Sequence, residues 1–292
     1  MLYDFPNTDA IGSIKLNKTN CSESNVKKRD ADIYCFETLT STMDKARELA
    51  RNNAPHLSVV VAKEQTKGRG RLNRTWVSER GGLWFTIILR PKLPPPLAFQ
   101  VNFAASLSLA KTLKQKYELD VSVKWPNDIL FKDKKLAGLL SELETDEDAI
   151  SFVNIGIGIN VNNNPDKDQS NAVSIKNILS KDSGEEISQM NLLYSFLDYF
   201  ENQLMDISIE ESLSPQPILQ SIDNTQQIQI KSARLIEQWK KMTSTIGRQV
   251  RIETFDGIYE GIAVDIDESG ALIINDENGI EKRVIYGDCF YQ

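Results

Sequence analysis

Two glycines and five basic residues share one short stretch of the chain, between Val59 and Trp76 (VVVAKEQTKGRGRLNRTW). The stretch opens as an apolar run and then carries one acid, Glu64, among the cations Lys63, Lys67, Arg69, Arg71 and Arg74. Glycine lets a backbone approach a ligand closely, and arginine presents a planar fork that suits carboxylate or phosphate oxygens. Because the net charge of the chain is −7, this local positive excess predicts a site for a small anionic ligand. A solvated basic loop without a ligand is the alternative interpretation.

The loop matches neither of two common phosphate-binding motifs. A P-loop requires Gly-Lys-Ser/Thr after a four-residue gap, which is absent here, and a dinucleotide fingerprint would require glycine where Asn73 stands. The single histidine, His56, lies in a polar turn, which predicts a surface position and disfavours a Ser-His-Asp triad. The loop therefore has to be interpreted together with the rest of the chain.

Composition is that of a globular chain with one large domain and one small one. The 292 residues are 40% hydrophobic and 26% charged, and no apolar run approaches the roughly 20 residues of a membrane span. The amino terminus lacks a basic region followed by an apolar core, so we expect no secretory signal. Cys21, Cys35 and Cys289 are odd in number and have no paired spacing, which favours a reducing cytoplasm and disfavours a zinc site.

The elements around the loop begin after a polar segment. Residues 1–32 show no sustained period, so we expect a flexible tail that is too short for a helix-turn-helix domain. A strand at 33–36 leads to a helix that ends near Asn52, and Ser41 with Asp44 resembles a capping box. The start of this helix leaves backbone N–H groups for an anion or a polar ligand, although a plain N-cap remains an alternative.

The remaining pattern predicts an α+β fold with a mixed or antiparallel sheet and flanking helices. Expected strands cover 59–61, 83–89, 121–125, 129–131, 135–143 and 150–161, and expected helices cover 97–117, 190–204 and 230–242. Short polar turns between the later strands favour antiparallel pairing, and the acidic segment 206–229 is expected to be an irregular connector. From 246 to 290, short β-runs alternate with the hairpin signals Asp256-Gly257, Ser269-Gly270 and Asn278-Gly279, which predicts a small SH3-like barrel.

Several motifs now stand in one order along the chain. They are Ser41-Thr42, Gln65 with GRGRLNRTW, KWPND at 124–128, KLAG at 135–138, GIGINVN at 156–162, and the terminal barrel. Over roughly residues 33–292 this series resembles the biotin–protein ligases, also called holocarboxylase synthetases or biotin–acetyl-CoA-carboxylase ligases, in the archaeal-type form that lacks an amino-terminal DNA-binding domain. The chain departs from the family pattern where Leu72-Asn73 replace a second Arg-Gly pair and where Met43 replaces a frequent Asn.

The resemblance implies a class II synthetase-like fold of the biotin/lipoate ligase type. It also implies three segments: a flexible tail at 1–32, a catalytic domain at 33–243 and the SH3-like barrel at 244–292. The implied reaction has two steps, in which biotin and ATP give biotinyl-5′-AMP and pyrophosphate, and an acceptor lysine then expels AMP. Cations and Mg²⁺ must reduce the repulsion between the two anions, and a mobile loop must keep water from the mixed anhydride.

The resemblance also assigns residues to roles. The implied catalytic residues are Lys124, at the α-phosphate, and Arg69. Biotin would contact Ser41, Thr42, Gln65, Gly68, Arg69, Gly70, Arg71, Lys135, Gly138 and Gly156, with Gly158 on the same strand face. ATP would contact Arg69, Arg71, Arg74, Trp76, Lys124, Asn127, Lys135 and Asn160, and Asp128 is the candidate Mg²⁺ ligand. Structural alternatives stay open for Trp76 as core, for Asn127 and Asp128 as a turn, and for Gly156 as a packing residue.

The implied partners are biotin, ATP and a biotin carboxyl carrier protein or domain, with a homodimer formed through an exposed strand edge. Neither nucleic acid nor a membrane is expected. Alternative functions are a lipoate–protein ligase, which shares the fold and the acyl-adenylate chemistry, and a biotin-sensing regulatory protein. A binding module without catalysis, built on the barrel, would leave the basic loop unexplained.

Overall fold

The computed structural model describes residues 14–16, 32–165, 171–179, 186–207 and 224–292. The chain divides into two compact units, and each is described by itself. The first unit comprises Met1–Pro91 and Leu130–Ser195, and the second comprises Lys92–Ile129 and Phe196–Gln292. The fold is α+β with a mixed sheet and flanking helices, as the sequence predicts.

The first unit is built on a sheet with the strand order β1-β2-β3-β4-β8-β7. Only β2 and β3 run parallel among the strand pairs described there, and the others are antiparallel. Every residue of β4 is buried, which explains why its sequence LWFTIIL is apolar except at Thr86. The strands are β1 (Ile14–Leu16), β2 (Ile33–Leu39), β3 (Ser58–Gln65), β4 (Leu83–Leu89), β7 (Lys134–Asp146) and β8 (Ala149–Ile159).

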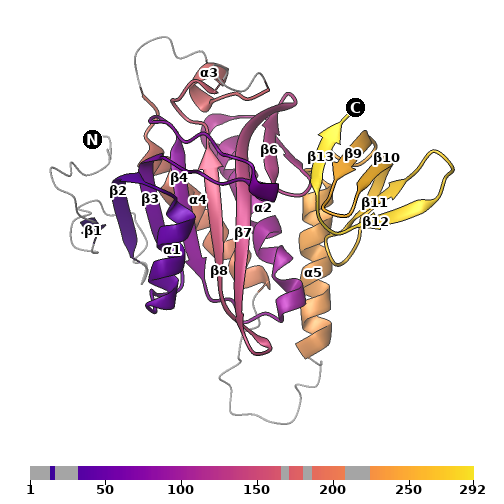
Figure 1. Ribbon diagram of the computed structural model, residues 1–292, viewed down its shortest axis with the longest axis horizontal. Helices are drawn as coiled ribbons and strands as arrows, with labels where there is room; N and C mark the ends of the chain where they lie inside the picture. Colours follow the sequence, from indigo (N-terminus) through magenta and orange to yellow (C-terminus); the bar gives the residue numbers. More distant parts are fainter. Residues whose placement is uncertain (1–13, 17–31, 166–170, 180–185, 208–223) are drawn as a thin grey trace. The chain divides into compact units, whose positions relative to one another are not determined.

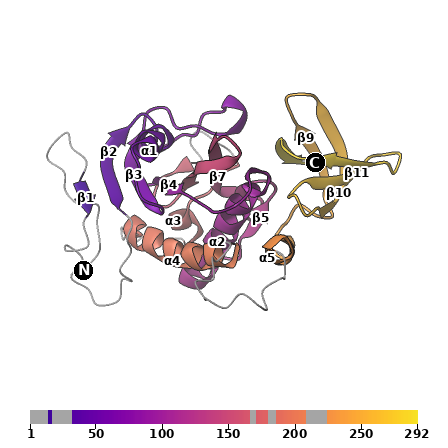
Figure 2. The same cartoon turned by 90° about the horizontal axis from the view of Figure 1, so that it is seen from below.

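Helix α1 (Thr42–Arg51) covers one face of this sheet, and Figures 1 and 2 show it alongside β3 and β4. Its small apolar residues, Ala46 and Ala50, pack in a buried cluster with Val60, Ile88 and Phe152 from three strands. The first turn of α1 lies beside the end of β3 and the middle of β4, because Thr42 forms hydrogen bonds with Gln65 and Thr86. A short helix, α3 (Ile175–Ile178), completes the described helices that lie wholly within this unit.

The second unit contains α2 (Phe99–Tyr117) and α5 (Asn224–Lys240), which pack against each other. Phe103 stacks on Trp239 with ring centroids 4.8 Å apart, and Trp239 Nε1 donates to Ser106 Oγ at 2.9 Å. The unit also holds β5 (Ser122–Lys124). Along the chain, β6 (Asp128–Phe131) and α4 (Gln189–Ile207) cross the boundary between the units.

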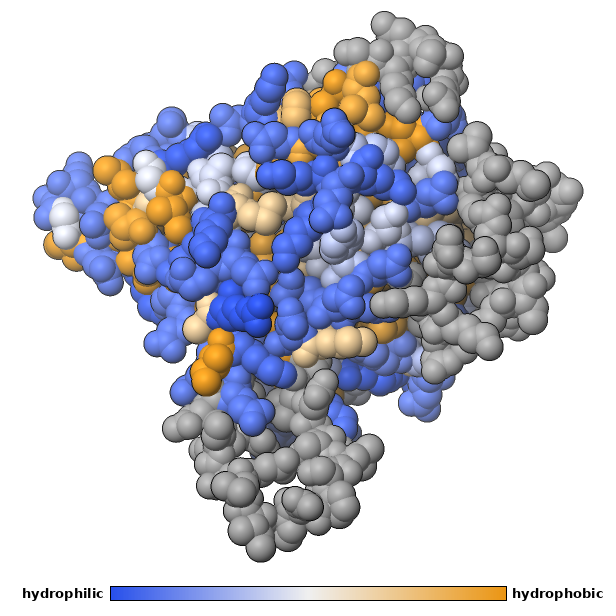
Figure 3. Space-filling model, turned by 180° about the vertical axis from the view of Figure 1, so that it is seen from behind, coloured by the Kyte–Doolittle hydropathy of each residue, from blue (hydrophilic) through white to orange (hydrophobic). Residues whose placement is uncertain are grey.

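The carboxy-terminal barrel has five strands in the order β12-β11-β10-β9-β13, all antiparallel. The strands are β9 (Gln249–Glu253), β10 (Ile258–Ile266), β11 (Leu272–Asn275), β12 (Glu281–Val284) and β13 (Asp288–Tyr291). Gly270 and Gly279 adopt positive φ in the β10–β11 and β11–β12 turns, as the hairpin signals predict. Most of the exposed large hydrophobic side chains described belong to this barrel: Phe255, Ile258, Ile262, Val264, Ile280, Ile285 and Tyr286. Figure 3 shows hydrophobic surface, in orange, at its left.

Several predicted boundaries are wrong in detail: β2 continues to Leu39, β3 to Gln65 and β7 to Asp146. Helix α5 begins at Asn224, inside the segment 206–229 that was expected to be irregular, and α4 continues to Ile207. The first residues of α5 are polar and show no apolar period, so no hydrophobic pattern predicts where this helix begins. Their helix propensity alone is too weak a signal. Strand β1 pairs with β2 although residues 1–32 were expected to lack elements, because three residues are too few to show a period. The remainder of the tail and residues 208–223 lie outside the described residues.

The expectation that His56 lies at the surface agrees with the structure. His56 is exposed, and its Nδ1 accepts a hydrogen bond from Arg90 N at 2.9 Å. Cys35 and Cys289 are buried free thiols, while Cys21 lies outside the described residues. Within the described part of the chain, no helix combines the length and the apolar content needed to cross a membrane.

Candidate functional site

The residues expected to hold a neutral polar ring meet at the start of α1. Ser41 is the N-cap, and its Oγ accepts a hydrogen bond from Met43 N at 3.2 Å. Gln65 Oε1 accepts two hydrogen bonds from Thr42, one from its backbone N at 2.7 Å and one from its Oγ1 at 3.0 Å. Ser41 and Thr42 are both buried. The structure therefore brings Ser41, Thr42 and Gln65 together, although 23 positions separate Thr42 from Gln65 in the chain.

Two further hydroxyls, not identified from the sequence, fix this group. Thr86 Oγ1 on β4 donates to Thr42 Oγ1 at 2.8 Å, and Gln65 Nε2 donates to Ser78 Oγ at 2.8 Å. Ser78 Oγ in turn donates to Trp76 O at 3.1 Å. Both ends of the Gln65 amide are thus oriented by buried partners. A lone threonine inside the apolar strand LWFTIIL was the available signal for Thr86, since a buried hydroxyl requires a partner.

The glycine–arginine loop, residues 66–76, closes on itself as a narrow hairpin. Trp76 N donates to Gly68 O at 3.0 Å, and Gly70 N donates to Arg74 O at 2.7 Å. A Cβ at Gly68 would lie 2.3 Å from Trp76 O, so this position requires glycine because of close approach. Gly70 does not require it, because its φ is −108° and a Cβ would come no nearer than 3.4 Å to another atom. The left-handed conformation in the loop falls instead on Leu72, at φ 48°.

Arg69 reaches out of this hairpin to two acidic side chains. Its Nη2 lies 2.9 Å from Asp44 Oδ1 on α1 and 3.1 Å from Glu142 Oε1 on β7. Arg47 pairs with the same two carboxylates. The guanidinium of Arg69 is therefore a structural link between the loop, the helix and the sheet. Of the other loop arginines, Arg71 is half-buried and Arg74 is exposed.

Three glycines form a flat floor on β7 and β8. Gly138 pairs with Gly158 across the two strands, and Gly156 lies two residues before Gly158 on the same face. A Cβ at Gly138 or Gly158 would lie within 3 Å of the Trp76 indole, and a Cβ at Gly156 would lie 2.7 Å from Met43 Sδ. The floor is thus covered by two large side chains, Trp76 and Met43, that come from outside it.

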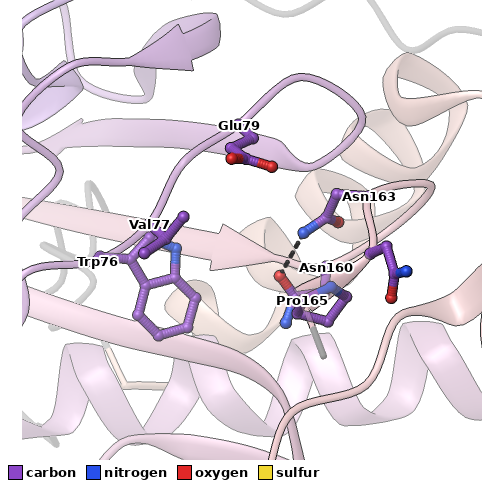
Figure 4. A pocket seen from close by; sticks show the side chains of 7 residues that line it. Trp76, Val77, Glu79, Asn160, Asn163 and Pro165 are labelled. Atoms are coloured by element: carbon purple, nitrogen blue, oxygen red, sulfur yellow. Dashed lines mark hydrogen bonds between the residues drawn. The ribbon is translucent and has the colours of Figure 1, made fainter. Parts of the chain in front are cut away.

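The Trp76 indole is also bordered by a cation and a small pocket. Lys135 Nζ lies 5.0 Å from the centre of the Trp76 ring system. The pocket beside the indole is lined by Trp76, Val77, Glu79, Asn160, Asn163, Asn164 and Pro165. Figure 4 shows Trp76 on one side of it and Asn160 with Pro165 on the other. Asn160 is buried, and its Oδ1 accepts from Asn163 Nδ2 at 2.9 Å, so its amide is held in one orientation.

The indole nitrogen of Trp76 is buried and forms no hydrogen bond within the described part of the chain. Such an unsatisfied donor costs free energy, which is unusual in a native structure and calls for an explanation. Two explanations are available: the indole ring changes position when a ligand binds, or its N–H donates to an acceptor atom of the ligand. This favours a ligand role for Trp76 over a purely structural core position.

The second unit holds the KWPND group. Trp125 is buried, its N donates to Thr245 Oγ1 at 2.9 Å and its Nε1 donates to Gly270 O at 3.0 Å, in agreement with the packing role predicted for it. Lys124 is half-buried, and its Nζ lies 4.5 Å from the centre of the Tyr291 ring. Asn127 is half-buried and precedes Asp128, the first residue of β6.

The pKa of the Cys289 thiol is influenced by one cation and two carboxylates of this unit. Burial raises the pKa of the Cys289 thiol to about 11, Lys124 acts to lower that pKa, and Asp128 and Asp288 act to raise it. Lys124 and two carboxylates are therefore close to one buried side chain. No cluster of three or more His, Cys, Asp or Glu side chains suited to a metal occurs in the described ranges.

The predicted site residues thus fall into two groups. The first unit holds, at the glycine floor, in the loop or in the pocket beside Trp76, Ser41, Thr42, Gln65, Gly68, Arg69, Gly70, Arg71, Arg74, Trp76, Lys135, Gly138, Gly156 and Asn160. The second unit holds Lys124, Asn127 and Asp128. The first group can bind a flat, neutral, hydrogen-bonding ring beside a basic loop, and the second offers an ammonium group beside carboxylates.

Comparison with known proteins gives consistent matches along the chain. Residues 35–160 match the Biotin/lipoate A/B protein ligase family, and residues 245–291 match the Biotin protein ligase C terminal domain. The chain is 34% identical over 251 residues to the bifunctional ligase/repressor BirA of Bacillus subtilis (strain 168), a match that covers 86% of this chain and 71% of that protein. It is 28% identical over 239 residues to the biotin--[acetyl-CoA-carboxylase] ligase of Mycobacterium tuberculosis, with 80% and 78% covered. Among solved structures, the biotin protein ligase of Aquifex aeolicus in complex with biotin and ATP matches with a TM-score of 0.68 and 26% identity, over 89% of this chain and 98% of that one.

Proposed function

The chain belongs to the biotin protein ligase family of ATP-dependent ligases, and from this premise we propose that it biotinylates a lysine of a biotin carboxyl carrier domain through biotinyl-5′-AMP. The observation that carries the proposal is the oriented Gln65 amide. Its Oε1 accepts from Thr42 and its Nε2 donates to Ser78, and Thr42 in turn accepts from Thr86, the strand partner of Gly156 in the glycine floor. A ureido ring offers both N–H donors and a carbonyl acceptor, so it suits a wall of hydroxyl and amide groups over a flat floor.

In the first step a biotin carboxylate oxygen bonds to the α-phosphorus of ATP, and the bond to the bridging β-phosphate oxygen breaks. Pyrophosphate leaves with that electron pair. The carboxylate and the triphosphate repel each other, and Lys124 stabilises the charge that grows on the α-phosphate. Arg71, Arg74 and Lys135 of the first unit add further positive charge, while Asn160 and Trp76 hold the adenine.

In the second step the amine of the acceptor lysine attacks the anhydride carbonyl, and AMP leaves. Water competes with the amine, so the loop has to remain closed between the steps. The Gly68–Trp76 hairpin contacts and the Arg69 ion pairs support this role, because they hold the loop against α1 and β7. The loop then acts as a cover and as a source of cations.

Mg²⁺ is part of the proposal as the partner of ATP. Proteins commonly bind it through one or two carboxylates together with substrate phosphates, and Asp128 of the KWPND group could supply such a carboxylate. When bound, the ion would supply further neutralisation of the phosphate charge. We also propose that the protein resides in the cytoplasm, where Cys35 and Cys289 would stay reduced. A homodimer is likewise proposed.

The function is tested by ATP–pyrophosphate exchange with the purified chain. We expect exchange that depends on biotin and Mg²⁺ and that lipoate does not support. A carrier domain added with biotin and ATP should gain the mass of one biotin on a single lysine. Exchange that depends on lipoate and not on biotin would overturn the proposed substrate.

A further inference from the structure

Tyr291, the penultimate residue of the chain, lies between two cationic side chains. Lys124 Nζ lies 4.5 Å from the centre of its ring, and Arg248 Cζ lies 4.3 Å from the same centre. Lys124 Nζ is also 6.0 Å from the centre of the Phe290 ring. The aromatic end of β13 therefore contacts the lysine of the KWPND motif directly.

The Tyr291 ring is held in place by its own hydroxyl and by the sheet. Its OH lies 3.0 Å from Ser244 Oγ and 3.1 Å from Thr245 Oγ1. Its backbone pairs with Val250 on β9, and Gln292 N donates to Gln249 O at 3.1 Å. Thr245 Oγ1 also accepts from Trp125 N, so a single threonine hydroxyl connects the end of β13 with the residue that follows Lys124.

The lysine strand is tied to the same segment on its other side. Val123 N donates to Met242 O at 3.0 Å, and Ser244 N donates to Val123 O at 3.0 Å. The backbone on both sides of Lys124 is thus fixed by residues 242–245. The lysine side chain still has several rotatable bonds, so its ammonium group needs a separate contact if it is to stay in one position.

We infer that Tyr291 is a positioning residue of the ligase reaction, whose ring holds the Lys124 ammonium toward the α-phosphate and holds Arg248 beside it as the cation for the departing pyrophosphate. The face of an aromatic ring attracts cations, and Arg and Lys both make this contact. The inference rests on the proposed function, because it assumes that Lys124 meets ATP. It gives the carboxy-terminal barrel a direct part in adenylate formation.

The charge arrangement around β13 supports the inference. Lys124 and Arg248 share one ring, and Asp128 and Asp288 both influence the neighbouring Cys289. Two cations suit a polyphosphate, and two carboxylates suit the Mg²⁺ that accompanies it. In the reaction the oxygen–phosphorus bond to biotin forms as the bond to pyrophosphate breaks, so positive charge is needed both at the α-phosphate and at the leaving group.

The test compares Tyr291→Leu with Tyr291→Phe in biotin-dependent ATP–pyrophosphate exchange. Loss of the ring in Tyr291→Leu should lower kcat about tenfold while KM for biotin stays unchanged. Tyr291→Phe loses the hydroxyl contacts but keeps the ring, which the β13–β9 pairing still holds, and should stay within about threefold of the unaltered chain. Tyr286→Leu is the matched control, since Tyr286 belongs to the same barrel and its ring contacts Phe255. Circular dichroism and Tm of each variant report whether the barrel remains folded.

A double-mutant cycle separates positioning from a general effect on the fold. In a Lys124→Ala background, Tyr291→Leu should cause no further loss of kcat, because the ring then has no ammonium to hold. Arg248→Met should raise the inhibition constant of pyrophosphate about tenfold, as expected for the loss of one charged contact. An unchanged kcat in Tyr291→Leu, equal losses in the Leu and Phe variants, or full additivity with Lys124→Ala would overturn the positioning role.

An unchanged inhibition constant in Arg248→Met would overturn the assignment of Arg248. Failure of the proposed function has a different signature, because the unaltered chain would then show no biotin-dependent exchange at all. The two failures are therefore distinguishable in the same assay.

Discussion

Arg69 Nη2 lies 2.9 Å from Asp44 Oδ1, and this ion pair joins the glycine–arginine loop to the first turn of α1. The same nitrogen lies 3.1 Å from Glu142 Oε1 on β7. One guanidinium thus contacts a helix and a strand that are almost 100 positions apart in the chain. Arg69 anchors the loop, and this anchoring can be tested separately from any contact with the ligand.

Asp44→Asn should loosen the loop without changing the residues that face the ligand. Partly exposed ion pairs contribute about 0.2–1 kcal/mol each, so we expect a two- to fivefold rise in AMP release from biotin and ATP when no acceptor is present. The measurement is the rate of AMP formation by chromatography. Glu48→Gln, which removes the Lys45–Glu48 pair on the same helix, is the control and should leave this rate unchanged.

Arg69→Ala tests whether the guanidinium does more than anchor. If it also stabilises charge in the first step, adenylate formation should fall roughly 100-fold, and we expect this larger loss. The measurement is pyrophosphate release in a single turnover. A change no larger than that of Asp44→Asn would restrict Arg69 to the anchoring role.

Thr86→Val removes the hydroxyl that donates to Thr42 while preserving the shape of the side chain. Loss of one buried hydrogen bond corresponds to about 1 kcal/mol, so the Kd for biotin should rise about fivefold. Isothermal titration with biotin alone gives this Kd. Thr112→Val is the control, because Thr112 is also buried and donates to Ser108 O, far from Gln65 in the chain. It should change Tm and leave the Kd for biotin as it is.

Gly68→Ala and Gly70→Ala form a matched pair within the loop. A Cβ at Gly68 would lie 2.3 Å from a backbone oxygen, whereas a Cβ at Gly70 would lie in ordinary contact at 3.4 Å. We therefore expect adenylate formation to fall at least tenfold for Gly68→Ala and less than threefold for Gly70→Ala, in line with the cost of a forced backbone shift. Equal losses would show that a bound ligand approaches the Gly70 backbone too closely for a Cβ to fit.

The buried thiols should be unreactive at ordinary pH. Burial raises the pKa of Cys35 to about 12 and that of Cys289 to about 11, and iodoacetamide reacts with the thiolate. At pH 8 both should resist alkylation in the native protein and react after unfolding in urea, as followed by peptide mass spectrometry. Because the folded pKa of Cys35 is raised above 9.0, its contribution to stability is complete below pH 9 and is lost as the pH approaches 12. Cys35→Ala should flatten that decline.

The sequence was sufficient for those parts of the fold in which a local pattern is strong. Leu83–Leu89 is predicted with its observed ends, because this run, apolar except for Thr86, is bounded by Gly82 and Arg90. The Ser41 cap and the hairpin glycines were also identified, since their chemistry is local. The start of α5 was not, because its polar first residues lack a period.

The site was predictable as a set of residues but not as a network. Gln65 and Thr42 were expected near the same ligand. Their direct hydrogen bond, however, depends on how the end of β3 lies against the first turn of α1. Thr86 and Ser78 could not be predicted, because each is a single hydroxyl in the sequence and its hydrogen-bond partner is defined only by the fold. The pairing of Arg69 with Asp44 likewise requires the fold, because sequence shows charges but not which ones meet.

The position of Trp76 on the glycine floor gives the protein an intrinsic optical reporter. Trp84, Trp125 and Trp239 are fully buried, and only Trp76 among the four tryptophans is partly exposed. A molecule that settles on Gly138 and Gly158 has to displace this indole, while the other three keep their surroundings. Fluorescence emission should therefore change as biotin or ATP arrives, and a Trp76→Phe variant should be nearly silent, so that occupancy can be followed in real time without a label.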